Sequence, residues 1–156
     1  MILQSENVFE NCSSMDDLQV SALAILEEHA ASGREIHYVA GPISSDGDEH
    51  IQRNIAELQR QRAGVAAELG ERAVVFCALD IFTPTVFDRL KVFGMPRDER
   101  EEKMRQFWHS IFESGGIKKA HFADRWWLSV GASLEHDDSI AFNIERAYLP
   151  AVSRES

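Results

Sequence analysis

Ser129, Gly131 and Glu135 bring a hydroxyl, a glycine and a carboxylate close together in the sequence, directly after an apolar and aromatic run over 120–128. The pattern predicts a strand, a tight turn and the first turn of a helix. Glycine permits close backbone approach or a positive φ at such a turn, and the N–H groups and positive end of a helix N-terminus attract anions. Glu135 is therefore a candidate nucleophile or base. Ser129 and the turn amides are a candidate cradle for a phosphate or hydroxyl group.

A purely structural interpretation of the same residues stays open. Serine directly before a helix is a routine N-cap, because its hydroxyl accepts a hydrogen bond from a free backbone N–H group. Glutamate in a first helical turn is favoured by the helix dipole. These residues alone therefore do not separate a site from an ordinary helix start.

A second segment, 36–45, predicts a short strand that runs into a Gly-Pro loop. An amphipathic helix follows, with apolar residues at spacings of three, four and seven: Ile51, Ile55, Leu58, Val65 and Leu69. In a parallel α/β sheet, this loop and the turn after residue 128 both lie at the carboxyl ends of strands, where ligands bind. We therefore expect Tyr38, Ser44, Ser129 and Glu135 to line one pocket, with the Glu135 carboxylate near the Tyr38 hydroxyl.

These two motifs, Tyr38-Val39-Ala40-Gly41-Pro42 and Ser129-x-Gly131-x-x-x-Glu135, resemble the nucleoside 2-deoxyribosyltransferase-like superfamily. The form Trp126-x-x-Ser129 is most similar to its uncharacterised branch, which includes phage-encoded proteins. The resemblance spans about 36–147. It implies an α/β fold with a small flavodoxin-like or Rossmann-like parallel sheet flanked by helices. Here an extra N-terminal helix precedes that unit.

The resemblance also implies roles for individual residues. Glu135 would be the nucleophile at C1′ of the sugar, forming a glycosyl ester, and Tyr38 would lie beside its carboxylate. Relatives that act on free nucleosides have Asp at the position of Ser129, whereas relatives that act on nucleotides have Ser. An Asp would repel a phosphate dianion, while a hydroxyl and helix N–H groups attract it. We expect the substrate to contact Gly41, Pro42, Ser44, Ser129, Gly131 and Trp126.

One departure from the family pattern concerns proton transfer to the leaving base. The family places an Asp some eighteen to twenty residues before the position of Ser129, but 107–111 contains no carboxylate here. His109 is the candidate replacement, since its reference pKa lies near neutral. The alternative is that His109 is an ordinary residue of a helix surface. Without the Asp, a hydrolase or a ligand-binding relative without catalysis becomes a stronger alternative to a transferase.

The function predicted from these observations is hydrolysis or transfer of the N-glycosidic bond of a nucleoside 5′-monophosphate-like substrate, without cofactor or metal. The alternative is a non-catalytic nucleotide sensor or accessory protein, and a structural or interaction protein is a third, weaker possibility. A metal site in the run 135–138 is disfavoured because successive helical residues point in different directions. The mixed-charge run 97–105 is interpreted as a solvated helix face.

Composition fits one structural domain, with an N-terminal extension over 1–35 and an α/β domain over 36–150. The formal net charge of −10 disfavours a nucleic-acid polymer or an anionic membrane as partner, but not a small nucleotide or nucleoside. Cys12 and Cys77 are too few for a disulfide scaffold and lack metal-ligand spacing, which fits a cytoplasmic protein. The resemblance implies a homodimer or larger homo-oligomer.

The remaining elements are predicted from apolar periodicity and from the positions of Gly, Pro and Ser, which mark the ends of helices and strands. Helices are predicted over about 14–31, 48–69, 96–114 and 132–148. Strands are predicted over 36–40, 73–79 and 119–128, with a helical turn near 85–91. The sheet should have three or four strands, and residues 1–12 are expected to form an arm or an edge strand that covers the sheet.

Overall fold

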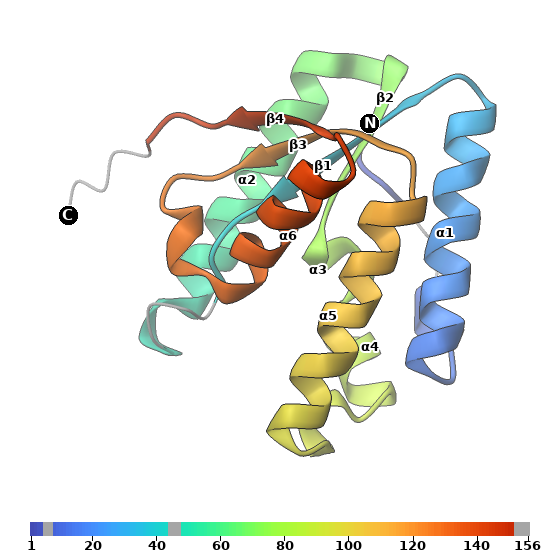
Figure 1. Ribbon diagram of the computed structural model, residues 1–156, viewed down its shortest axis with the longest axis vertical. Helices are drawn as coiled ribbons and strands as arrows, with labels where there is room; N and C mark the ends of the chain where they lie inside the picture. The colour runs from blue at the N-terminus through green and yellow to red at the C-terminus, as the bar shows by residue number, and fades with distance from the viewer. Residues whose placement is uncertain (5–7, 44–47, 152–156) are drawn as a thin grey trace.

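The computed structural model describes residues 1–4, 8–43 and 48–151. Its centre is a parallel sheet of four strands in the order β2-β1-β3-β4 (Figure 1). The strands are β1 (Glu35–Ala40), β2 (Ala73–Cys77), β3 (Ile117–Phe122) and β4 (Glu145–Tyr148). The α/β fold with a small parallel sheet flanked by helices is therefore confirmed.

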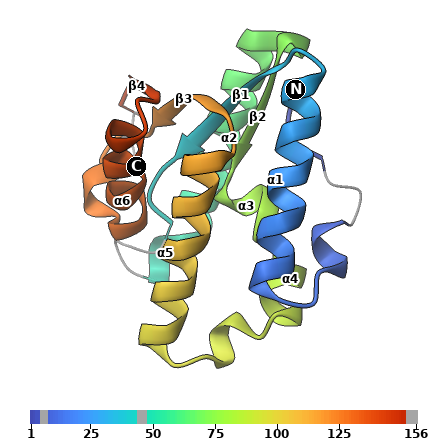
Figure 2. The same ribbon diagram turned by 45° about the vertical axis from the view of Figure 1, so that its right-hand side comes forward.

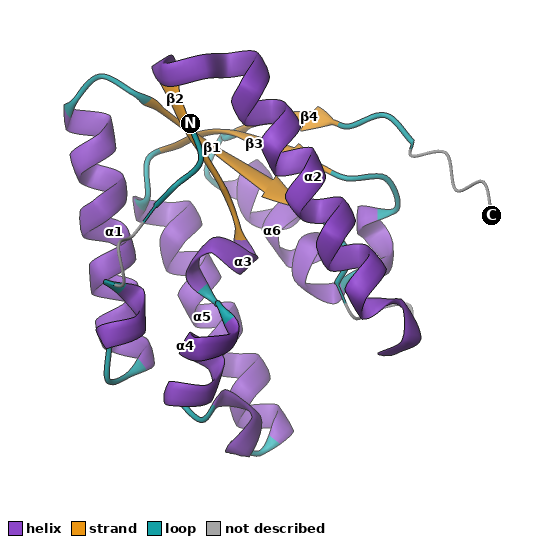
Figure 3. Cartoon of the chain, turned by 180° about the vertical axis from the view of Figure 1, so that it is seen from behind, coloured by secondary structure: helices purple, strands orange, loops and turns teal. Residues whose placement is uncertain are grey.

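Helices cover both faces of the sheet. On one face lie α1 (Met15–Ala31), α5 (Arg97–Ser114) and α6 (Val130–Ala141), which bury their apolar sides against the strands (Figure 2). On the other face lies α2 (Ile51–Leu69), which packs on β1 and β2 (Figure 3). Two short helices, α3 (Ala78–Ile81) and α4 (Pro84–Arg89), connect β2 to α5. Because helices cover both faces of β2, all five residues of that strand are buried.

The N-terminal segment belongs to the same core. Ile2 forms a parallel bridge with Val75, and the backbone N–H of Leu3 donates to the Val75 carbonyl at 3.0 Å. The expected edge pairing of the N-terminal residues is therefore present, along the outer side of β2. Ser14 caps the N-terminus of α1, since its side chain accepts from the Asp17 N–H. The buried residues of α1 join the core beneath β1.

Three predicted boundaries are wrong. β2 ends at Cys77, because α3 begins at Ala78. The strand predicted over 119–128 ends at Phe122, because Arg125 adopts a left-handed backbone (φ 62°) and Trp126–Leu128 then form a 3-10 turn. The helix predicted over 132–148 ends at Ala141, after which Asn143 takes φ 57° and the chain turns into β4. Asparagine tolerates that conformation better than most residues.

The strand order fixes where a site forms. The chain leaves β1 towards α2 on one face and leaves β3 towards α6 on the other, which creates a crevice at the carboxyl ends of these two neighbouring strands. The loops approach each other closely there. The Ala123 N–H donates to the Ala40 carbonyl at 2.8 Å, and a Cβ added at Gly41 would lie 2.9 Å from the Ala123 Cβ. Gly41 is therefore needed for the close approach of the two strand ends.

Candidate functional site

A cavity of about 560 Å³ lies at this crevice. The end of β1 and the loop after it form one side, α5 another, and the first two turns of α6 a third. Its lining combines apolar side chains with a few polar groups, as small-molecule sites usually do. Among its lining residues are Tyr38, Gly41, Ile43, Ala78, Arg97, Met104, Trp108, Ser129, Gly131 and Glu135.

Tyr38 and Glu135 meet in this cavity. The Tyr38 hydroxyl donates to the Glu135 Oε1 at 2.8 Å, although the residues are 97 positions apart. Both side chains are buried, with exposed fractions of 1% and 7%. The Tyr38 ring is held by Phe76, Trp108 and Phe112, at centroid distances of 5.0 to 5.3 Å. The packed ring fixes the hydroxyl, and the hydroxyl in turn orients the carboxyl group.

Burial controls the protonation of this pair. Loss of hydration raises the pKa of Glu135 to about 8, because the charged form is the one that water stabilises most. Hydrogen bonding from Tyr38 opposes that shift, and the nearby charge of Asp138 adds to it. Desolvation and the Glu135 charge also raise the pKa of Tyr38 well above its ordinary value, so the phenol stays a donor. At neutral pH, Glu135 in the free protein is therefore mostly a neutral acid.

Ser129 caps the N-terminus of α6. Its Oγ accepts from the Ala132 N–H at 3.1 Å, as the structural interpretation of the sequence requires. Ser129 and the three residues after it also line the cavity, so the positive end of α6 faces the same space as Glu135. The two interpretations of Ser129 are compatible, since one hydroxyl both caps the helix and lies beside the cavity.

The special backbone expected at Gly131 is absent. Gly131 is not among the glycines with positive φ, and a Cβ added there would meet only the Ser129 Oγ, at 3.8 Å. The residue lies in the first turn of α6 and lines the cavity, but the turn does not require glycine. The close approach that we expected at Gly131 occurs at Gly41 instead.

Arg97 is a cavity residue that the sequence interpretation missed. It is the first residue of α5 and the only cation among the described residues that line the cavity. Its side chain is 80% exposed, and its Nε donates to Glu101 at 2.9 Å. The run 97–105 looked like a solvated face because it mixes positive and negative charges. The available signal was Pro96, which places Arg97 at a helix start.

His109 is not among the residues that line the cavity. It lies on the exposed side of α5, where its Nδ1 is 3.1 Å from Asp138 Oδ1 and its Nε2 is 3.6 Å from Glu113. Asp138 follows Glu135 by almost one turn of α6, so His109 contacts the next turn of that helix. The structure therefore does not bring His109 to the position that a proton donor to the leaving base would occupy.

The other predicted contact residues divide between the cavity and its surroundings. Trp126 stacks on His136, with ring centroids 4.0 Å apart, and is not among the cavity residues. Pro42 lines a small crevice beside Gly41 and α2. Ser44 lies outside the described residues. The structure thus brings Tyr38, Gly41, Ser129, Gly131 and Glu135 together, and does not place Trp126, Pro42 or His109 with them.

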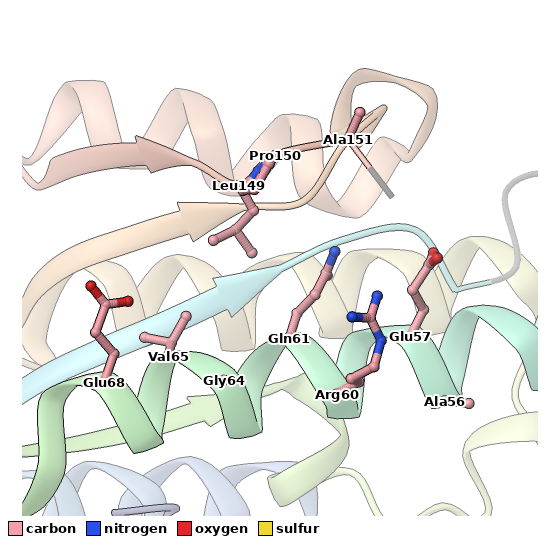
Figure 4. Close-up of a pocket in the computed structure, with 10 residues that line it drawn as sticks. All are labelled: Ala56, Glu57, Arg60, Gln61, Gly64, Val65, Glu68, Leu149, Pro150 and Ala151. Atoms are coloured by element: carbon pink, nitrogen blue, oxygen red, sulfur yellow. The ribbon is translucent and has the colours of Figure 1, made fainter. Parts of the chain in front are cut away.

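A larger hollow, of about 900 Å³, lies on the opposite face between α2 and the residues after β4 (Figure 4). Gln61 and Val65 of α2 and Leu149 border it. Its lining includes none of the predicted site residues and no buried acid. The larger of the two hollows is therefore not the one that contains the Tyr38–Glu135 pair. Within the described part of the chain, no cluster of three or more His, Cys, Asp or Glu is arranged to hold a metal ion. Nor is any described helix long and apolar enough to cross a membrane.

Comparisons with protein-family models, with curated proteins and with solved structures give no match to this chain.

Proposed function

We propose that this protein hydrolyses or transfers the N-glycosidic bond of a nucleoside 5′-monophosphate-like substrate, with Glu135 as the nucleophile. The observation that supports it most is the buried Tyr38–Glu135 hydrogen bond of 2.8 Å in a cavity that also receives the N-terminus of α6. The first two turns of α6 thus offer both a positioned carboxyl group and, one turn earlier, N–H groups suited to an anion.

The proposed reaction has two steps. A Glu135 carboxylate oxygen forms a bond to C1′ as the bond from C1′ to the base nitrogen breaks. The electron pair of the broken bond leaves with the base. The transition state has oxocarbenium character, which a nearby carboxylate stabilises. Water or a second base then attacks C1′ and releases the Glu135 carboxylate, and the proton that the attacking molecule loses balances the one taken up by the departed base. Tyr38 holds the carboxyl group in place through its hydrogen bond.

Glu135 must lose its proton before it attacks. Because burial raises its pKa to about 8, the reactive carboxylate is a minority form at neutral pH. The rate of the first step should therefore rise with pH and level off above about 8. Glu135 is the only carboxyl group among the described residues that line the cavity. The absence of a second acid there favours hydrolysis over efficient exchange of bases.

The phosphate would lie against the first turn of α6. Ser129 supplies a hydroxyl there, and the first amides of α6 supply donors whose dipoles favour an anion. Arg97 supplies a positive charge from the first residue of α5. Its partner Glu101 is exposed, so the guanidinium can exchange that contact for a phosphate oxygen.

A second candidate function is nucleotide binding without turnover. The raised pKa of Glu135 favours it, because a neutral carboxyl group is a hydrogen-bond donor to a ligand oxygen and a poor nucleophile. Under either function we propose a small nucleotide or nucleoside as ligand, a homodimer or larger assembly, and a cytoplasmic location. The free cysteines Cys12 and Cys77 are consistent with a reducing compartment.

The decisive experiment separates the products of a panel of nucleoside monophosphates after incubation with the protein. Wild-type protein should release free base from at least one of them. Glu135→Gln should abolish release while retaining nucleotide binding, since the amide keeps the shape and removes the nucleophile. Glu27→Gln is the matched control, because Glu27 is exposed on α1. Binding without any release of base would support the sensor, and full activity in Glu135→Gln would refute the proposed role of Glu135.

A further inference from the structure

A second cavity, of about 590 Å³, adjoins the cavity that contains Glu135. Ile43, Ala78 and Met104 line both. Residues from the N-terminal half of α2, the α3–α4 region and the N-terminal half of α5 line the second cavity. The helices α2, α3, α4 and α5 themselves can be followed in Figure 3. A ligand in the first cavity can therefore extend into the second without leaving the protein surface.

The walls of the second cavity are mainly apolar. Ile51 and Ile55 come from α2, and Phe82 and Phe87 come from the α3–α4 region, with their rings 5.4 Å apart. Asp88 and Arg100 are its only charged lining residues among those described. A concave surface of this composition favours an apolar or aromatic group over a phosphate or a sugar.

The sequence of α2 supplies apolar residues here that core packing does not use. Leu58 and Val65 lie on the same helical stripe and are buried against the sheet, with exposed fractions of 3% and 6%. Ile51 and Ile55 continue that stripe beyond the sheet, where they are half-buried. Neither belongs to the described core clusters. Their side chains face the second cavity, so they are placed to contact a ligand.

The arrangement of the two cavities determines the orientation of a bound ligand. Residues of α6 line the first cavity, whereas the described lining of the second includes none of them. Met104 and Ala78 line both cavities, so a nucleotide with its phosphate at the N-terminus of α6 and C1′ near Glu135 can direct its base towards them. Their side of the first cavity adjoins the second cavity.

We propose that the second cavity binds an apolar substituent carried by the leaving base. The preferred substrate class is then a nucleoside monophosphate whose base bears an alkyl or arylmethyl group. This inference rests on the proposed function for the direction of the ligand. Ile55 and Phe87 would set the preference for the substituent, while Glu135 and Ser129 contact the sugar phosphate.

The test uses two nucleoside monophosphates that differ only in a benzyl group on the exocyclic amine of the base. Calorimetry with Glu135→Gln measures binding without turnover, and base release by the wild-type protein measures the reaction. The benzylated compound should bind at least about tenfold more tightly, since several apolar carbons leave water. Ile55→Trp, which fills the cavity, and Ile55→Asp, which makes it polar, should each remove most of that preference. Val20→Asp is the control, because Val20 is 67% exposed on α1.

The outcomes separate this inference from the proposed function. If neither compound loses its base, the proposed reaction fails, while tighter binding of the benzylated compound still supports the second cavity as its binding site. Equal affinity for the two compounds would overturn the inference. So would a preference that persists in both Ile55 variants, or one that Val20→Asp removes equally.

Discussion

Tyr38 and His37 are neighbours on β1 whose side chains lie on opposite faces of the sheet, and each forms a buried polar contact with a distant residue. Tyr38 donates to Glu135 beside a cavity. His37 Nδ1 lies 2.9 Å from His121 Nε2 of β3, and its Nε2 lies 3.0 Å from Glu35, which is bound by Lys118. One strand therefore carries two buried polar pairs with different surroundings.

The two pairs differ in the groups to which they are connected. The histidine pair continues through Glu35 to Lys118 at the surface, so the network ends in solvated charges. The Tyr38–Glu135 pair ends at a buried carboxyl group whose neighbouring space is a cavity. Burial of an acid is unfavourable unless it is neutral or paired, and such acids mark functional sites more often than surface ion pairs do. The histidines therefore belong to a network that reaches solvent, whereas Glu135 borders a cavity, as its proposed chemical role requires.

The largest expected effect comes from removing the acid on one face of the sheet, and a histidine on the other face serves as the control. Glu135→Gln should lower the rate of base release by at least about 10³-fold, as expected when a nucleophile is lost. His121→Gln should change it by less than about twofold, because His121 lies on the face away from the cavity. Single-turnover release of base measures both. Comparable losses in the two variants would remove the functional distinction between the pairs.

Ser129→Asp should separate phosphate recognition from sugar recognition. Aspartate also caps helices well, so α6 should form normally. Its charge should weaken the binding of a nucleoside 5′-monophosphate by roughly 10- to 100-fold, through repulsion in a partly desolvated site. The affinity for the free nucleoside should stay unchanged. Titration of each variant with a nucleoside and its monophosphate measures the difference. Equal losses for the two ligands would refute a phosphate at α6.

Stability should depend on the protonation of Glu135. Its folded pKa of about 8 lies above the ordinary value of 4.5, so the folded state binds the proton more tightly than the unfolded state. The free energy of unfolding contributed by Glu135 is therefore fully present below pH 4.5 and decreases as pH rises to about 8. The slope should be at most about 1.4 kcal/mol per pH unit. Denaturant titrations of wild type and Glu135→Gln should converge at low pH, with the variant more stable at pH 9. Parallel pH profiles would contradict the raised pKa.

His121 should give a pH dependence of opposite sign. Burial, followed by the charges of His37 and Lys119, lowers its pKa from 6.5 to about 4. The unfolded state then binds the proton more tightly, so this contribution to stability is present above pH 6.5 and is lost as pH falls towards 4. His121→Gln should flatten that part of the stability curve and leave the part above pH 7 unchanged. A variant whose acid sensitivity equals that of wild type would refute this assignment.

The smallest effect is expected from His109. Because it lies outside the cavity and contacts Asp138 and Glu113, His109→Ala should change the rate of base release by less than about threefold. Loss of a general acid would lower that rate by roughly 10²-fold or more. Steady-state kinetics across pH 5 to 9 distinguishes the two. A hundredfold loss at neutral pH would show that His109 reaches the reacting atoms through a movement of α5.

The sequence was informative where a residue follows a buried parallel strand. Tyr38 lies near the end of β1, and Ser129 and Glu135 follow β3, so parallel pairing brings their neighbourhoods to one edge of the sheet. Ser129 as an N-cap was equally predictable. These features depend on local patterns and on one general rule about parallel sheets.

Features that depend on tertiary packing were not predictable. The short strand β4 has no alternating apolar pattern, and Asn143 carried only a weak signal that α6 ends before it. The aromatic residues at 126–128 looked like a strand, but Arg125 turns the chain first. Arg97 looked solvated because it belongs to a mixed-charge run, and Pro96 marks a helix start without showing which side of α5 faces the cavity. Trp126 stacks on His136, a contact that requires β3 and α6 to be placed first.

The most direct test of the account is a rapid-quench experiment with the wild-type protein and a nucleoside monophosphate, followed by peptide mass spectrometry. The account predicts a transient addition of the sugar phosphate, without its base, on the peptide that contains Glu135. The addition should be absent in Glu135→Gln. Release of base with Glu135 unmodified at every quench time, or a sugar phosphate attached to another residue, would contradict the proposed role of Glu135.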